Sequence, residues 1–277
     1  MEKLEAALAK ARQMRQQAMG TRRPVTPGEA DKSRPESRAD AWIDAFQEIV
    51  LDPARLERNR ITALAGGREA TPYDMLRSRS LRFMREKEWN RLAITSPGAA
   101  CGKTTIAVNL ALSLARQKDL KVMLFDLDLR RPALHRVLGQ APSVSFHEVL
   151  TDRASFQDNG RRIGDNLVVA MNAGPARMPA EILQAERTAE ILDEIERRWQ
   201  PDIMIFDTSP LLATDDNVGF LSNVDCALLV AAAEKTTLPN IDICEKELAQ
   251  LTNVLGVVLN KCRYPDTLAG YDYEYYG

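Results

Sequence analysis

Residues 92–115 read LAITSPGAACGKTTIAVNLALSLA. The apolar run before Ser96 predicts a buried strand, and the apolar residues after Lys103 recur at the spacing of a helix. Between them lies a loop of small residues that ends in Gly-Lys-Thr. A strand, a tight loop of this kind and a helix form the context that predicts a phosphate-binding P-loop. The loop amides and the helix N-terminus would both face the phosphates of a nucleotide.

The P-loop motif predicts separate roles for neighbouring residues. Lys103 is predicted to reach the β- and γ-phosphates, and the Thr104 hydroxyl to bind Mg²⁺. Pro97 stands where the general pattern has its first glycine, so we expect the tight turn to come from the small residues beside it. The other residues predicted to contact the nucleotide are Gly98, Ala99, Ala100, Cys101, Gly102 and Thr105.

Two further apolar runs end in carboxylates. Residues 122–132 read VMLFDLDLRRP, with Asp126 and Asp128, and residues 203–210 read IMIFDTSP, with Asp207. Strands of an open α/β sheet place their ligands at this edge. Any one of these aspartates could be a capping or surface residue, but three of them beside a P-loop predict a site for Mg²⁺ and nucleotide.

Strand and helix patterns alternate from residue 91 onward. Several predicted strands are continuous apolar runs, as expected where helices cover both faces of a sheet. We predict strands at 91–95, 121–126, 166–170, 202–207, 226–231 and 254–260, and helices at 103–116, 180–198 and 241–251. This alternation predicts an α/β fold of the P-loop NTPase type, with a doubly wound, mainly parallel sheet.

The two ends of the chain differ from this pattern. Residues 1–18 space their apolar side chains as an amphipathic helix, and residues 19–40 are rich in proline and charge, which is typical of a disordered linker. We expect the P-loop domain to occupy residues 41–263. Residues 264–277 read YPDTLAGYDYEYYG and hold five of the six tyrosines, so they are predicted to form a separate tail.

Composition argues against several classes of protein. The 45% hydrophobic and 27% charged residues are typical of a globular chain. The apolar runs are shorter than the ~20 residues that cross a bilayer, and the N-terminus lacks the apolar core of a secretory signal, so we expect a cytoplasmic protein. A net charge of −2 argues against nucleic-acid binding. The four cysteines lack paired spacing and are predicted to be reduced thiols.

The three motifs resemble those of the bacterial tyrosine kinases, or BY-kinases, of capsule and exopolysaccharide synthesis, which are built on a deviant P-loop ATPase scaffold. SPGAACGKTT is similar to their Walker A motif, VMLFDLDLRRP to Walker A′ and IMIFDTSP to Walker B. The resemblance implies transfer of phosphate from Mg-ATP to tyrosine. It also implies autophosphorylation of the tail at Tyr271, Tyr273, Tyr275 and Tyr276.

The resemblance implies roles for individual side chains as well. Asp126 would position or deprotonate the tyrosine hydroxyl, while Asp128 and Asp207 would bind Mg²⁺. Together with Lys103 they would form the catalytic set. Arg130 would lie near a phosphate or an adjoining subunit.

Partners are implied in the same way. Relatives work with a membrane-spanning polysaccharide co-polymerase, so a separate activator, recruitment to the inner membrane through it, homo-oligomer formation and a cognate tyrosine phosphatase are expected. The oligomerisation pattern of relatives is an acid followed by arginines three and six residues later. Asp74 and Arg77 keep this pattern, but Ser80 replaces the second arginine.

Two other functions are compatible with the motifs. A partition- or positioning-type ATPase shares the scaffold, but its signature lysine, five residues before Lys103, is replaced here by Gly98. An ATP-binding regulator of polysaccharide export without kinase activity would keep the same constellation. Pro97 in the P-loop is compatible with that alternative.

Overall fold

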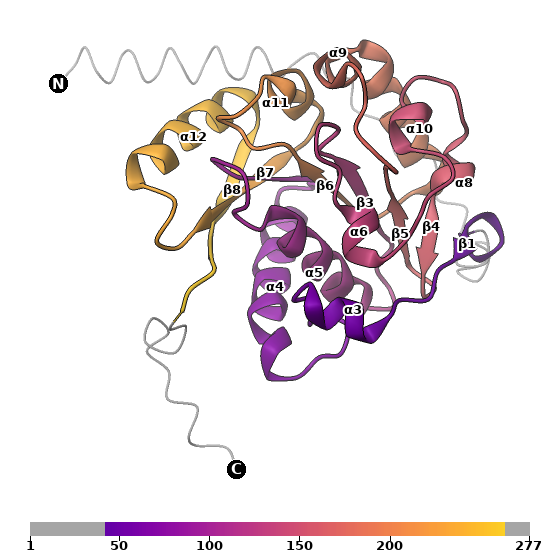
Figure 1. The fold of residues 1–277 in the computed structure, drawn as a ribbon, viewed down its shortest axis with the longest axis horizontal. Coiled ribbons are helices and arrows are strands. Elements are labelled where there is room, and N and C mark those ends of the chain that lie inside the picture. Colours follow the sequence, from indigo (N-terminus) through magenta and orange to yellow (C-terminus); the bar gives the residue numbers. More distant parts are fainter. Residues whose placement is uncertain (1–41, 264–277) are drawn as a thin grey trace. The chain divides into compact units, whose positions relative to one another are not determined.

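The computed structural model describes residues 42–263; the predicted segments 1–18, 19–40 and 264–277 lie outside these residues. Within this part an eight-stranded sheet has the order β1-β4-β5-β3-β6-β2-β7-β8 (Figure 1). Its strands are β1 (Gln47–Glu48), β2 (Arg91–Thr95), β3 (Val122–Leu127), β4 (Arg161–Ile163), β5 (Leu167–Ala170), β6 (Ile203–Thr208), β7 (Cys226–Ala232) and β8 (Asn253–Asn260).

Helices cover both faces of this sheet (Figure 1). One face packs against α3 (Pro53–Arg58), α4 (Thr71–Glu86), α5 (Lys103–Ala115) and α6 (Leu134–Leu138). The other packs against α7 (Phe146–Val149), α8 (Phe156–Asn159), α9 (Pro179–Gln184), α10 (Glu186–Trp199), α11 (Asp216–Phe220) and α12 (Leu238–Leu251). Two short 3₁₀ helices, η2 (Arg68–Ala70) and η3 (Leu221–Asn223), lie between elements.

The predicted doubly wound, mainly parallel sheet is confirmed. Every neighbouring pair of strands is parallel except β4 and β5, which run antiparallel. Each of the six predicted strands occurs within one residue of its expected ends. The two strands that were not predicted, β1 and β4, have two and three residues, too few for an apolar pattern to emerge.

The prediction of a single helix over residues 180–198 is wrong. It is two helices, α9 and α10, because Ala185 takes an extended conformation with φ −64° and ψ 135°. The Thr188 hydroxyl donates a hydrogen bond to the Ile182 carbonyl at 2.6 Å across this break. The apolar spacing continues through the break, so the sequence pattern does not reveal it.

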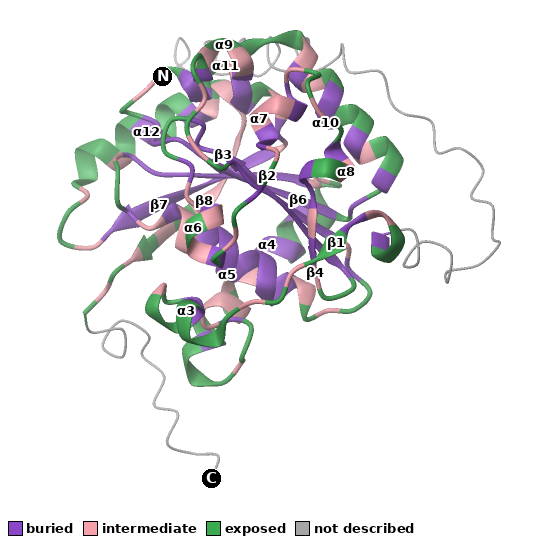
Figure 2. Ribbon diagram, turned by 45° about the vertical axis from the view of Figure 1, so that its right-hand side comes forward, coloured by how far each residue is buried: buried purple, intermediate pink, exposed green. Residues whose placement is uncertain are grey.

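Alternation along the buried strands divides the interior into two layers. In β3, Val122 and Leu124 belong to the layer beside α5, whereas Met123 and Phe125 belong to the opposite layer. Figure 2 shows the central strands as almost wholly buried. The Phe125 and Phe206 rings stack across neighbouring strands at 5.0 Å between centroids.

The same alternation determines which face of the sheet the acidic side chains point to. Asp126 follows Leu124 by two positions, and Asp207 follows Ile205 by two, so both carboxylates face the α5 layer. They are also register partners across β3 and β6. Within residues 42–263, no helix combines the length and the apolar character that crossing a membrane requires.

Leu110 in α5 tests the packing of this layer. The side chain is fully buried in the apolar core on the α5 side of the sheet, so Leu110→Ala should lower the free energy of unfolding by about 2–5 kcal/mol in urea titrations. Leu238→Ala, at a helical position that is 76% exposed, is the matched control and should change stability by less than about 0.5 kcal/mol. Equal losses for the two variants would contradict the packing described here.

Candidate nucleotide-binding site

The loop between β2 and α5 has the backbone shape of a phosphate cradle. Ala100 and Gly102 have positive φ values of 63° and 96°. Pro97 and Gly98 are not in the left-handed region, so the turn does not require a glycine at either position. Helix α5 then begins at Lys103 with no side chain capping its N-terminus, which leaves its first amides free to face an anion.

Three side chains from later in the chain hold the loop carbonyls. Lys235 Nζ donates to Ala99 O and Lys261 Nζ to Ala100 O, both at 2.8 Å, and Asn260 Nδ2 donates to Cys101 O at 2.9 Å. In a trans peptide the carbonyl and the next amide point in opposite directions. The amides of residues 100–102 are therefore directed away from these donors, as phosphate binding requires.

Sequence reasoning missed Asn260, Lys235 and Lys261. Asn260 ends β8 and Lys235 follows β7, so both lie at the sheet edge that carries the P-loop. The signal that points to Asn260 and Lys235 is a polar residue at or shortly after the end of a predicted buried strand, which is the same signal that identifies the aspartates.

The basic and acidic side chains of the motifs meet at this edge. Lys103 Nζ donates to Asp128 Oδ2 at 2.7 Å and lies 3.7 Å from Asp207 Oδ1. The Thr104 hydroxyl donates to Asp207 Oδ2 at 2.6 Å. All three predicted catalytic carboxylates are at least 96% buried, because Asp126 and Asp207 have no exposed surface and Asp128 has 4%.

Asp126 is held on one side only. Its Oδ2 accepts hydrogen bonds from the amides of Ala133 and Leu134 at 3.0 and 3.1 Å, whereas its buried Oδ1 has no hydrogen-bond partner. Burial, and then the neighbouring Asp207 carboxylate, raise the pKa of Asp126 well above its ordinary value. One oxygen is thus oriented by the backbone, and the other is buried without a hydrogen-bond partner.

Asp207 and Lys103 influence each other. Burial raises the pKa of Asp207, although the Lys103 ammonium works in the opposite direction. Burial alone would lower the pKa of Lys103, but Asp207 and Asp128 outweigh it and the pKa of Lys103 is raised. Lys103 therefore remains a cation in this site.

The carboxylate oxygens without hydrogen-bond partners fit Mg²⁺ bound together with a nucleotide better than a metal ion held by protein ligands alone. Asp207 Oδ1 is buried and accepts no hydrogen bond, like Asp126 Oδ1. Mg²⁺ binds oxygen ligands and usually takes only one or two carboxylates beside phosphate oxygens and water. In residues 42–263 no group of three or more His, Cys, Asp or Glu side chains is arranged to hold a metal ion. Thr104, Asp128 and Asp207 could hold Mg²⁺ that is already bound to a nucleotide.

Arg130 lies after β3 but is directed toward α11. Its guanidinium donates to both oxygens of the buried Asp216 at 2.8 and 2.9 Å, and this hydrogen bonding raises the pKa of Arg130. A phosphate contact would require Arg130 to leave this pair, so its nucleotide-binding role stays a prediction. Thr105 lies on the first turn of α5 beside Thr104.

The tail tyrosines and the cysteines are the remaining residues with a predicted role. Tyr271, Tyr273, Tyr275 and Tyr276 lie outside the described residues. The four cysteines are free thiols, and Cys101 is buried within the P-loop.

Comparisons with known proteins agree with this geometry. The family described as CobQ/CobB/MinD/ParA nucleotide binding domain matches residues 92–272. Tyrosine-protein kinase YwqD of Bacillus subtilis is 30% identical over 195 residues, which cover 69% of this chain and 79% of YwqD. The kinase domain of the Escherichia coli tyrosine kinase ETK superposes with a TM-score of 0.67 at 27% identity, covering 77% of this chain and 84% of that domain.

A third relative is much longer than this chain. The putative tyrosine-protein kinase in the cps region of Klebsiella pneumoniae is 30% identical over 221 residues, covering 78% of this chain but only 29% of that protein. This chain belongs to the CobQ/CobB/MinD/ParA family of nucleotide-binding domains and, within it, to the bacterial tyrosine kinases.

Gly102 tests the shape of the loop. A Cβ atom at this position would lie 2.2 Å from Asn260 Nδ2, and the backbone has a positive φ. Gly102→Ala should lower the free energy of unfolding by about 1–3 kcal/mol through backbone strain and displacement of Asn260. Gly98→Ala is the control, since a Cβ there meets no atom within 4 Å. Equal stability of the two variants in urea titrations would show that Gly102 is not constrained.

Asp126 predicts a pH dependence of stability. Its pKa is higher in the folded than in the unfolded chain, so its contribution to stability is present below the unfolded value and is lost as the pH rises through the folded value. The stability of Asp126→Asn should therefore increase relative to wild type between about pH 4 and pH 8. Urea titrations across this range measure the difference, with exposed Asp119→Asn as the control. A difference that is independent of pH would contradict a raised pKa.

Proposed function

We propose that this protein is an ATP-dependent tyrosine autokinase that regulates the polymerisation and export of an exopolysaccharide or capsule. One observation carries the proposal: Lys103, Asp126, Asp128 and Asp207 converge at a sheet edge beside a loop whose amides are turned inward. Membership of the bacterial tyrosine kinases supports the kinase chemistry over that of a positioning ATPase.

The proposed roles follow from the contacts. The amides of the P-loop and the Lys103 ammonium bind the phosphates of ATP, which requires Lys103 to exchange part of its contact with Asp128 for phosphate oxygen. Thr104, Asp128 and Asp207 hold Mg²⁺, which neutralises charge on the transferred group when it is bound. Positioning and charge stabilisation supply most of the rate enhancement in this chemistry.

Asp126 is the proposed proton acceptor. Its Oδ1, which has no hydrogen-bond partner, would take the proton of a tyrosine hydroxyl. At the same time the hydroxyl oxygen of the tyrosine forms a bond to the γ-phosphorus, and the bond between that phosphorus and ADP breaks. The amides of Ala133 and Leu134 fix the carboxylate in orientation. Burial raises the pKa of Asp126 toward neutral pH, and a general base is most effective when its pKa lies near the pH at which the enzyme works.

The partners remain proposals that rest on the resemblance. We infer a membrane-spanning co-polymerase as activator, recruitment to the inner membrane through it, a homo-oligomer in which one copy phosphorylates the next, and a tyrosine phosphatase. Asp74, of the incomplete oligomerisation motif, accepts hydrogen bonds from Arg116 and Ser113 of its own chain, and Arg77 donates to Asp74 and Ser113. These contacts explain intrachain packing and leave the homo-oligomer to be tested.

Phosphotyrosine mapping tests the kinase proposal. The purified protein is incubated with Mg-ATP, with and without the cytoplasmic segment of the co-polymerase, and modified tyrosines are identified by mass spectrometry. Phosphate should appear on Tyr271, Tyr273, Tyr275 or Tyr276, and Lys103→Met should reduce it by at least ~100-fold because a phosphate contact is lost. Lys118→Met, an exposed lysine after α5, should leave phosphorylation unchanged.

The alternatives give different results in the same experiment. ATP binding without tyrosine modification, even with the activator segment, would overturn the kinase proposal and favour a non-kinase regulator. Release of phosphate to water with no modified tyrosine would favour a partition-type ATPase.

A further inference from the structure

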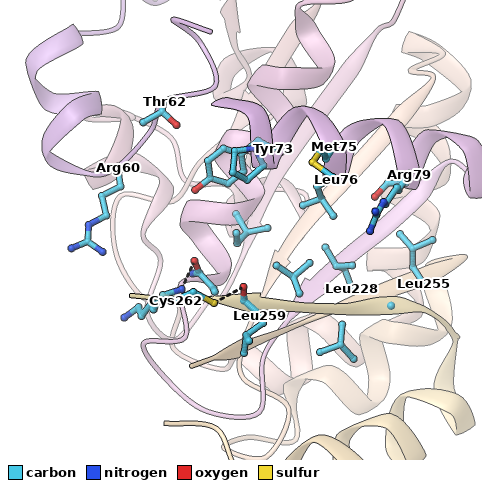
Figure 3. A pocket seen from close by; sticks show the side chains of 18 of the residues that line it. Arg60, Thr62, Tyr73, Met75, Leu76, Arg79, Leu228, Leu255, Leu259 and Cys262 are labelled. Atoms are coloured by element: carbon cyan, nitrogen blue, oxygen red, sulfur yellow. Dashed lines mark hydrogen bonds between the residues drawn. The ribbon is translucent and has the colours of Figure 1, made fainter. Parts of the chain in front are cut away.

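An open groove of about 1060 Å³ lies between α4 and β8 (Figure 3). Leu76, Leu228 and Leu255 lie among its lining side chains, as Figure 3 shows. Four further apolar side chains that line it are unusually exposed for their size: Met75 and Phe83 at 51%, Val257 at 47% and Leu259 at 53%. An apolar patch of this kind marks a surface that binds another segment.

Strand β8 adds a second reason for the groove to be covered. It is the last strand of the sheet and pairs only with β7 among the described residues. Its outer edge therefore presents backbone groups that no described strand pairs. Exposed edges of this length are usually covered by another part of the protein or by a partner.

The charged side chains around the groove indicate which kind of segment it would bind. Arg60, Arg79 and Lys261 line it, against Glu57 and Glu69. Arg60 and Arg79 form no ion pair with any residue between 42 and 263. An occupant that combines aromatic rings with carboxylates would complement both the apolar lining and the unpaired arginines.

We propose that residues 264–277 of this same chain bind in the groove. The described chain ends at Arg263, and Lys261 and Cys262 line the groove, so the tail begins at one end of it. The tail contains five tyrosines, two aspartates and one glutamate, and no lysine or arginine. Fully extended it can reach about 46 Å, longer than the roughly 27 Å of an eight-residue strand.

Docking of the tail connects the groove to the nucleotide loop. Asn260 and Lys261 line the groove and also donate to the carbonyls of Cys101 and Ala100. A tail segment in the groove therefore contacts the residues that fix the P-loop. Docking depends on the groove and the tail alone, so it stands or fails separately from the kinase proposal.

Methionine oxidation measures whether the groove is covered. Met75 in the groove and Met178 outside it are 51% and 59% exposed, so peroxide should oxidise them at similar rates if nothing covers the groove. In the 277-residue chain with limiting peroxide, mass spectrometry should find that Met75 is oxidised about tenfold more slowly than Met178. A tethered segment reaches millimolar effective concentration, which makes such occupancy attainable with weak contacts.

Charge reversal identifies the occupant. Asp272→Lys combined with Glu274→Lys should raise the Met75 rate about tenfold, as should Arg79→Glu, while all three changes together should restore slow oxidation. Arg85→Glu, an exposed arginine on the same helix outside the groove, should have no effect.

Three outcomes would overturn the proposal. The first is equal oxidation of Met75 and Met178 in the wild-type protein. The second is protection of Met75 that increases with protein concentration, which would indicate a second copy in the groove. The third is protection that survives tail charge reversal but is lost in Leu8→Glu, which would assign the groove to the N-terminal segment.

Discussion

Three buried carboxylates face one buried ammonium at the carboxyl edge of this sheet, and the surrounding structure is organised around that imbalance. Asp126 and Asp207 sit opposite each other in strand register, and Lys103 reaches only Asp128 and Asp207. Burial and mutual repulsion raise the pKa of Asp126, because water is excluded and no cation contacts it directly. A site with excess negative charge of this kind is suited to bind a divalent cation together with a nucleotide.

The apolar strands are what make the imbalance possible. Every residue of β3 and β6 is buried, so the carboxylates of Asp126 and Asp207 near the ends of these strands cannot turn toward solvent. The P-loop is fixed separately, through donors from the ends of β7 and β8. The proposed Mg²⁺ ligands Asp128 and Asp207 and the donors that hold the P-loop carbonyls thus lie on or beside different strands of one sheet.

The sequence predicted those parts that depend on local pattern. Continuous apolar runs located the six longer strands, and Gly102, Lys103 and the three aspartates were found because their chemistry is tied to the ends of those runs. The break at Ala185 could not be predicted because the apolar spacing continues through it. The contacts of Asn260 and Lys235 could not be predicted because they depend on which distant segments meet. The partner of Arg130 was missed for the same reason: Asp216 lies 86 residues further along the chain.

The positions of β1 and β8 give the domain a polarity. They are the two outermost strands, and the described chain enters beside β1 and leaves beside β8. Eight strands at the usual spacing separate these edges by about 34 Å. Anything that anchors the protein through residues before β1 would hold the opposite edge at a distance from the anchor. The exit edge, with the groove beside it, would then face away from the anchor.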